Sequence, residues 1–222
     1  MKKIPRILGI LTTIPILLTA APALLAFDMT GMPGRSFKGQ LPDLTAEQEK
    51  MAHNLEQHIT VLALQIGERH FLKPDKLQES ADYIFQVFDS LETSGLKTSR
   101  HEFIANGQRF ENIELTISGT EESDEIIVVG AHYDTVDNCP GANDNASGVA
   151  AILEMARILS LKPLSKTIRL VAFPNEEHFF GENQMGSYFY AKECRYRKDK
   201  IIAMISIETI GYYRNYKGSQ KY

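Results

Sequence analysis

Cysteine is scarce in this sequence of 222 residues, and the two that it has are Cys139 and Cys194. Neither belongs to a Cys-x-x-Cys pair or to a cluster of cysteine and histidine, which argues against a thiolate zinc site. Basic residues are not in excess either, since the net charge is -4 and the pI is about 5.9. Nucleic-acid binding needs a concentrated basic surface, so no nucleic-acid partner is expected.

Internal repeats and low-complexity tracts are also absent. The content of 43% hydrophobic and 23% charged residues is the balance of an ordinary globular protein. A chain of this length can bury one sizeable core. We therefore expect one folded domain over residues 44–222.

The N-terminus has the pattern of an export signal. Three basic residues precede an uncharged, mostly apolar run from Ile7 to Ala26, and Ala21-Pro22-Ala23 offers a cleavage site. The run is also about as long as the roughly 20 residues that cross a bilayer. Residues 1–26 are therefore predicted to be a signal peptide or a membrane anchor through residues 7–26, followed by a linker at 27–43. Either alternative places the domain in the periplasm or outside the cell, where the two cysteines are able to pair.

Two helices are expected at the start of the domain. Thr45 and Gln48 have the spacing of a capping box, and the apolar residues that follow recur at helical intervals. A second amphipathic pattern over about 73–93 stops before Gly95, a residue that commonly ends a helix.

Strand patterns alternate with helical patterns in the rest of the chain. The turn Ala105-Asn106-Gly107 predicts a hairpin. Three segments, at 125–132, 167–173 and 201–207, are rich enough in apolar residues to be strands buried on both faces, and the first contains the continuous apolar run Ile126 to Val129. Helical patterns follow the first two segments, which predicts parallel β-α-β units. The expected fold class is α/β, a mostly parallel central sheet with helices on both faces and an antiparallel hairpin at one edge.

Acidic residues and a histidine follow the ends of these buried strands. Ligands bind where the carboxyl ends of parallel strands meet. The residues expected at this edge are His132, Asp134, Asp144, Glu176, Glu177 and Glu208. Imidazole and carboxylate groups are ligands for zinc, cobalt or manganese. Two such ions that share one carboxylate would offset the charge of a cluster this acidic.

The other histidines have weaker claims. His178 adjoins the Glu176-Glu177 pair and is a candidate ligand, although its position favours an ordinary loop residue. The remaining histidines lie on predicted helices or on the hairpin and are assigned no chemical role; they are His53, His58, His70 and His101.

Three motifs taken together closely resemble the co-catalytic zinc aminopeptidase family. They are Gly-Ala-His-Tyr-Asp-Thr at 130–135, Gly-Ala-Asn-Asp-Asn-Ala-Ser-Gly at 141–148 and Asn-Glu-Glu at 175–177. That family includes aminopeptidases S and Y, relatives of glutamate carboxypeptidase II and the glutaminyl cyclases. The resemblance spans Thr45 to the C-terminus, and it implies a three-layer sandwich that hydrolyses a peptide bond at a free N-terminus with a zinc-activated water.

The resemblance also implies a role for each residue. The metal ligands it implies are His132, Asp144, Glu177 and Glu208, with two zinc ions in a complete site. Asp144 would bridge the two ions, and Asp134 would orient His132. Glu176 would be the general base that takes a proton from the water and passes it to the leaving amine.

Two departures from the family pattern qualify this expectation. Many members have aspartate where this chain has Glu208, which keeps the carboxylate on a longer stem. The family's last ligand, a histidine of the second zinc, lies on a later loop, and no histidine follows Glu208 here. We therefore expect the N-terminal portion of a catalytic domain, with one zinc held firmly by His132, Asp144 and Glu208, and impaired activity.

Two alternatives remain open for this sequence. Glutaminyl cyclases share the motifs but retain one zinc, and cyclisation of an N-terminal glutamine would identify such an enzyme. An inactive fragment or pseudoenzyme could instead persist as a binding domain. The expected partner in the main hypothesis is a peptide substrate; oligomeric state and substrate preference are not encoded in these motifs.

Overall fold

The computed structural model describes residues 39, 42–91, 95–121 and 123–212. All of its helices and strands belong to the unit formed by residues 44–222. The predicted export segment at 1–26 and most of the predicted linker at 27–43 lie outside the described residues and stay predictions. Among the helices that are described, none is both long and apolar enough to cross a bilayer.

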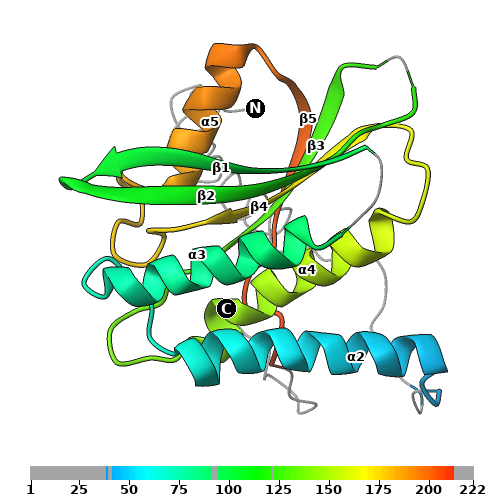
Figure 1. The fold of residues 1–222 in the computed structure, drawn as a ribbon, viewed down its shortest axis with the longest axis horizontal. Coiled ribbons are helices and arrows are strands. Elements are labelled where there is room, and N and C mark those ends of the chain that lie inside the picture. The colour runs from blue at the N-terminus through cyan, green and yellow to red at the C-terminus, as the bar shows by residue number, and fades with distance from the viewer. Residues whose placement is uncertain (1–38, 40–41, 92–94, 122, 213–222) are drawn as a thin grey trace, which may run out of the picture. The chain divides into compact units, whose positions relative to one another are not determined.

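A five-stranded mixed sheet forms the centre of this unit, in the order β1-β2-β4-β3-β5 (Figure 1). The strands are β1 (Leu96–Ala105), β2 (Gln108–Ile117), β3 (Glu125–His132), β4 (Thr167–Phe173) and β5 (Lys200–Ser206). β4, β3 and β5 run parallel, whereas β1 and β2 form an antiparallel hairpin at one edge. The predicted α/β fold is confirmed.

The hairpin turn follows from its two central residues. Ala105 pairs with Gln108, so the loop consists of Asn106 and Gly107 alone. Both have positive φ values, 47° and 73°, which is the backbone of a type I′ turn. Asparagine and glycine adopt this conformation at the lowest cost, which explains why this turn could be predicted.

The helices lie close to where the apolar spacing placed them. They are α2 (Ala46–Ile59), α3 (Pro74–Asp89), α4 (Ser147–Leu159) and α5 (Gly186–Arg197), with π-helical segments η1 (Thr60–Ile66) and η2 (Ala142–Ala146). The capping box of Thr45 and Gln48 is present at the start of α2. α3 ends at Asp89 rather than near residue 93, and the hydroxyl of Ser90, its C-cap residue, donates to the carbonyl of Val87.

Apolar side chains fill both sides of the sheet. The larger core packs strand residues such as Leu115 and Leu170 against Ile84 of α3 and Ile152 of α4. A smaller core beneath α5 includes Val128, Val171, Phe173, Tyr190 and Cys194. α5 therefore covers one face while α3 and α4 cover the other (Figure 1). Cys139 and Cys194 are both free, so the pairing that the sequence left open is not formed.

β5 differs from its sequence pattern. The apolar run at 201–207 predicts a strand covered on both faces, but Ile202, Met204 and Ile205 are 46%, 49% and 52% exposed. β5 pairs with β3 at the edge of the sheet, where Ile201 packs against the smaller core while the other side chains of the strand are exposed. Apolar composition favours a strand, whereas burial depends on what packs against it.

Candidate metal centre

The parallel strands bring their carboxyl ends to one edge of the sheet. His132 at the end of β3 pairs with Phe173 at the end of β4, and Gly130 pairs with Ser206 at the end of β5. The residues that follow each strand therefore start from neighbouring positions. Ligand atoms gather here in two groups, and within each group all of them lie within 4.8 Å of one another. The first group is His132 with Asp144 and Glu208, and the second is His132 with Glu176 and Glu177.

His132 is the centre of both groups and is buried. Its Nε2 lies 3.1 Å from Asp144 Oδ1 and 3.3 Å from Glu208 Oε2, while its Nδ1 lies 3.4 Å from Asp134 Oδ1. Burial on its own lowers the pKa of His132, but the carboxylates of Asp134 and Glu208 outweigh it and raise the pKa to about 11. The carboxylates thus favour a positive charge at this position.

Asp134 links the end of β3 to the loop after β4. Its side chain is 1% exposed, and its two oxygens accept hydrogen bonds from the backbone N–H groups of Glu176 at 3.1 Å and Glu177 at 3.0 Å. One carboxylate therefore fixes the adjacent glutamates and faces Nδ1 of His132 at the same time. This is the geometry of a residue that orients metal ligands without binding the metal.

The carboxylates of the cluster have raised pKa values. Burial, followed by the charge of Asp144, raises the pKa of Glu177 to about 7. Burial is also the largest cause of the raised pKa values of Asp144 and Glu176, and neighbouring carboxylates add to it. Acidic groups this close need a cation or a proton to offset their repulsion.

The residues present fit a bound divalent cation. Asp144 Oδ1 and His132 Nδ1 are buried and have no hydrogen-bond partner among the residues that the structure describes. A buried carboxylate oxygen without a hydrogen bond is costly unless a positive charge lies against it, and here that charge is either the protonated His132 ring, whose Nε2 is 3.1 Å away, or a bound cation. The histidine and carboxylate set is also the donor set that zinc and related ions accept.

Asn145 is fully buried and joins the start of α4 to the end of β5 through its side-chain amide. Its Oδ1 accepts from the N–H of Gly148 at 3.0 Å, and its Nδ2 donates to Ile207 O at 2.9 Å and Glu208 Oε2 at 3.2 Å. A Cβ at Gly148 would lie 2.6 Å from Ile207 O, so only glycine allows this approach of α4 to the end of β5. Asn145 therefore holds Glu208 in place beside His132.

Arg69 is a residue that the sequence analysis missed. Its side chain is fully buried, and its guanidinium donates to five backbone carbonyls, those of Leu62, Gly67, Tyr133, Pro140 and Gly141. Burial lowers the pKa of Arg69 to about 10, with Asp134 acting against the shift, so the group stays charged at neutral pH. Arg69 thereby ties the end of η1 to the loop that carries Asp134 and Asp144.

His178 lies apart from this centre. It belongs to neither group around His132 and forms a separate group with His70 and Asp137. His53, His58 and His101 also lie outside the metal centre, as the sequence indicated; His58 contacts Tyr83, and His101 contacts Glu114 and Glu193.

Asp134→Asn tests the orienting role. The asparagine amide would place N–H groups against the N–H of Glu176 or Glu177 and would remove the charge that faces His132. We expect the affinity for zinc to fall by about 10- to 100-fold with little change in the fold. Competition with a chromophoric chelator measures the affinity, and Asp75→Asn on the exposed face of α3 is the control. Equal zinc affinity in both variants would contradict the role given to Asp134.

The sequence is similar to a known family of peptidases. Residues 112–220 match peptidase family M28. The uncharacterized protein YfbL of Escherichia coli is 36% identical over 177 residues, which are 76% of this chain and 52% of YfbL. Aminopeptidase YwaD of Bacillus subtilis is 55% identical over 53 residues, which are 24% of this chain and 12% of YwaD. The chain thus spans about half the length of YfbL and a smaller share of YwaD.

Solved structures show the same fold. A zinc aminopeptidase from Bacillus subtilis superimposes with a TM-score of 0.62 and 17% sequence identity, over 72% of this chain and 69% of that one. The match supports the layered architecture and the order of the strands.

Proposed function

We propose that this chain, whose residues 112–220 match peptidase family M28, acts as a zinc-dependent exopeptidase of the aminopeptidase type. The observation that carries the proposal is the convergence of His132, Asp144 and Glu208 on one point beside the Glu176-Glu177 pair. The YwaD relative is named an aminopeptidase, and its similarity to this chain supports the same reaction class.

Four side chains would hold zinc at this centre. They are His132, Asp144, Glu177 and Glu208, and their ligand atoms lie at the carboxyl edge of the sheet. Bound zinc polarises a carbonyl oxygen and makes water a stronger nucleophile at neutral pH. Asp134 keeps Nδ1 of His132 turned away from the metal position, which leaves Nε2 toward the carboxylates.

Glu176 is the general base in this proposal. Its backbone N–H donates to Asp134, and its carboxylate lies in the same group of ligand atoms as the His132 ring. The raised pKa of Glu176, caused mainly by burial, makes it a better proton acceptor than an exposed glutamate. It would take a proton from the attacking water and deliver it to the amine nitrogen that leaves.

Peptides with free and with acetylated N-termini test this function. We expect the chain to release N-terminal residues from the free peptides only, as mass spectrometry would detect. Removal of metal with 1,10-phenanthroline should abolish the release, and added zinc should restore it. Asp144→Asn is the control for contaminating peptidases, because it removes a metal ligand.

Three outcomes would contradict the proposal. Equal cleavage of blocked peptides would exclude an aminopeptidase. Cyclisation of N-terminal glutamine without cleavage would favour the glutaminyl cyclase alternative. Zinc-dependent peptide binding without any turnover would favour the alternative of a binding domain.

A further inference from the structure

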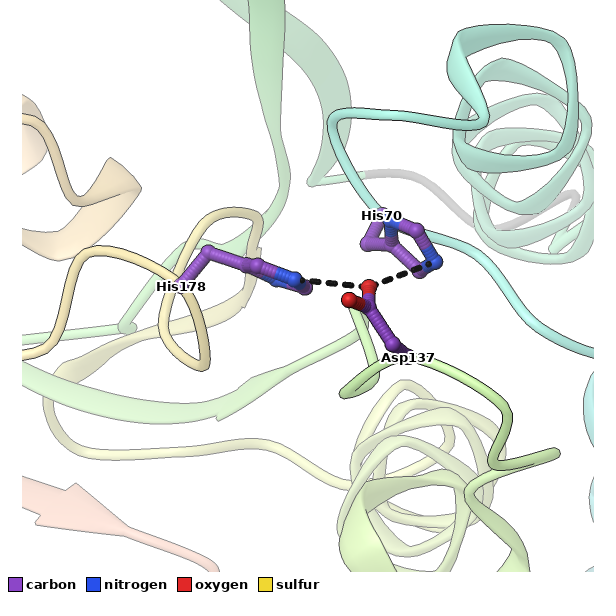
Figure 2. A group of neighbouring side chains, drawn as sticks. All are labelled: His70, Asp137 and His178. Atoms are coloured by element: carbon purple, nitrogen blue, oxygen red, sulfur yellow. Dashed lines mark hydrogen bonds and ion pairs between the residues drawn. The ribbon is translucent and has the colours of Figure 1, made fainter.

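A second cluster of ligand-type side chains lies outside the metal centre. It consists of His70, Asp137 and His178, whose ligand atoms all lie within 4.8 Å of one another (Figure 2). The three come from separate parts of the chain. His70 lies between η1 and α3, Asp137 lies after β3, and His178 lies after β4. None of them belongs to the groups around His132.

Two imidazole nitrogens point at a single carboxylate oxygen. Asp137 Oδ1 lies 2.9 Å from His178 Nε2 and 3.3 Å from His70 Nε2 (Figure 2). The two rings are 4.9 Å apart between centroids and inclined by only 34°. Both Nε2 atoms and the carboxylate thus face one small volume, which is the arrangement that three ligands of a single ion require.

Packing holds the two rings in these positions. His70 is 2% exposed, and its ring lies beside Phe71. Phe71 also contacts the ring of His178 edge to face at 4.9 Å and that of Phe179 at 5.1 Å. The Asp137 side chain, by contrast, is 52% exposed, so an ion can enter from solvent on that side.

Glu68 adds a second negative charge. Its Oε1 lies 2.8 Å from His70 Nε2 and accepts from the N–H of Asn138 at 2.7 Å, while its other oxygen pairs with Lys73. The cluster therefore offers two imidazoles and two carboxylates. That combination suits a zinc-like transition-metal ion better than calcium or magnesium, which prefer oxygen ligands alone.

We propose that His70, Asp137 and His178 bind a further divalent transition-metal ion, distinct from those at the His132 centre. Each histidine would bind through Nε2 and carry its proton on Nδ1, and a water would complete the coordination. The long contact of 3.3 Å from the Leu72 N–H to His70 Nδ1 would give way on binding.

Such an ion would join the two loops that build the main centre. Asp137 follows Asp134 by three residues, and His178 directly follows Glu177. Binding would tie both loops to the segment before α3. Its role would be to hold these loops in place, while the chemistry stays at the His132 centre.

The zinc content of paired variants tests the proposal. The background variant Asp144→Asn/Glu208→Gln weakens the main centre through two partly exposed carboxylates. Asp137→Asn and His178→Gln are then added singly. We expect the background protein to retain one zinc ion per chain after gel filtration, and each added change to weaken this zinc by about 100-fold or more. His53→Gln, an exposed histidine of α2, should leave it unchanged.

Further measurements identify the ligands. Visible absorption of Co²⁺ bound to the background protein should lose intensity in Asp137→Asn and in His178→Gln. Zinc should also raise the melting temperature of the background protein but not of these two variants. Asp137 is half exposed, so Asp137→Asn keeps the test valid should His178→Gln fail to fold.

Equal zinc content and equal cobalt spectra in the background, Asp137→Asn and His178→Gln would overturn the proposal. The result is independent of peptidase activity, because the background variant already lacks two ligands of the main centre. An inactive protein that still binds zinc through Asp137 would contradict the proposed function and support this site.

Discussion

Glu176→Gln is expected to lower kcat for peptide hydrolysis by about 100- to 10,000-fold, the usual contribution of a general base. Glutamine has the same size but cannot accept a proton from water at neutral pH. The backbone N–H of Glu176 would still donate to Asp134, so the loop should keep its position. Zinc content and the melting temperature should stay close to those of the unchanged chain. Steady-state kinetics on a peptide with a free N-terminus measure the effect.

The matched control is Glu182→Gln, an exposed glutamate on the same loop. It should leave kcat unchanged. Activity of the unchanged chain should also fall as pH drops through the raised pKa of Glu176, because a base works only when it is deprotonated. A Glu176→Gln variant that retains full activity, or one that loses its zinc, would remove Glu176 from the role of base.

Most of the fold could be predicted from local patterns because those patterns agree with the packing. The segment at 125–132 has an apolar centre, Ile126 to Val129, and becomes a central strand with helices on both faces of the sheet. Asn106 and Gly107 can form their turn with few other contacts, so their sequence was sufficient. β5 shows the limit, since the same kind of apolar run lies at an exposed edge. No local signal reports which neighbours a strand will have.

The site was predictable to the extent that strand ends define it. His132 ends β3, and Glu177 and Glu208 lie shortly after β4 and β5, so a rule about the carboxyl ends of parallel strands predicts that they meet. Asn145 and Arg69 support the site by donating hydrogen bonds to backbone carbonyls that are far away in the sequence. No sequence motif predicts such long-range partners.

His70 is a further residue whose role could not be predicted from the sequence. The sequence predicts no chemical role for His70, whereas the folded chain brings it next to Asp137 and His178. These three residues lie before α3, after β3 and after β4, so only the sheet and the packing of η1 bring them together. A ligand set drawn from three loops has no motif that could be recognised in advance.

Arg69→Met should destabilise the protein by about 3 to 5 kcal/mol, because it leaves buried carbonyls without donors and removes a buried charge that they solvate. Methionine fills similar space, so the loss is one of hydrogen bonds rather than of volume. Urea unfolding followed by circular dichroism measures the change, with the slope of the transition expected to stay constant. Arg195→Met, at an exposed position of α5, should change stability by less than about 0.5 kcal/mol.

Arg69→Lys separates the charge from the geometry of the guanidinium. Lysine keeps the charge but has three donors at one point, so it cannot reach Leu62, Tyr133 and Gly141 from one position. Its stability should fall between the unchanged chain and Arg69→Met. Zinc affinity should fall along with it, since the carbonyls of Tyr133 and Gly141 flank the positions of Asp134 and Asp144. A stable Arg69→Met variant with unchanged zinc affinity would show that the loop holds its shape without the guanidinium.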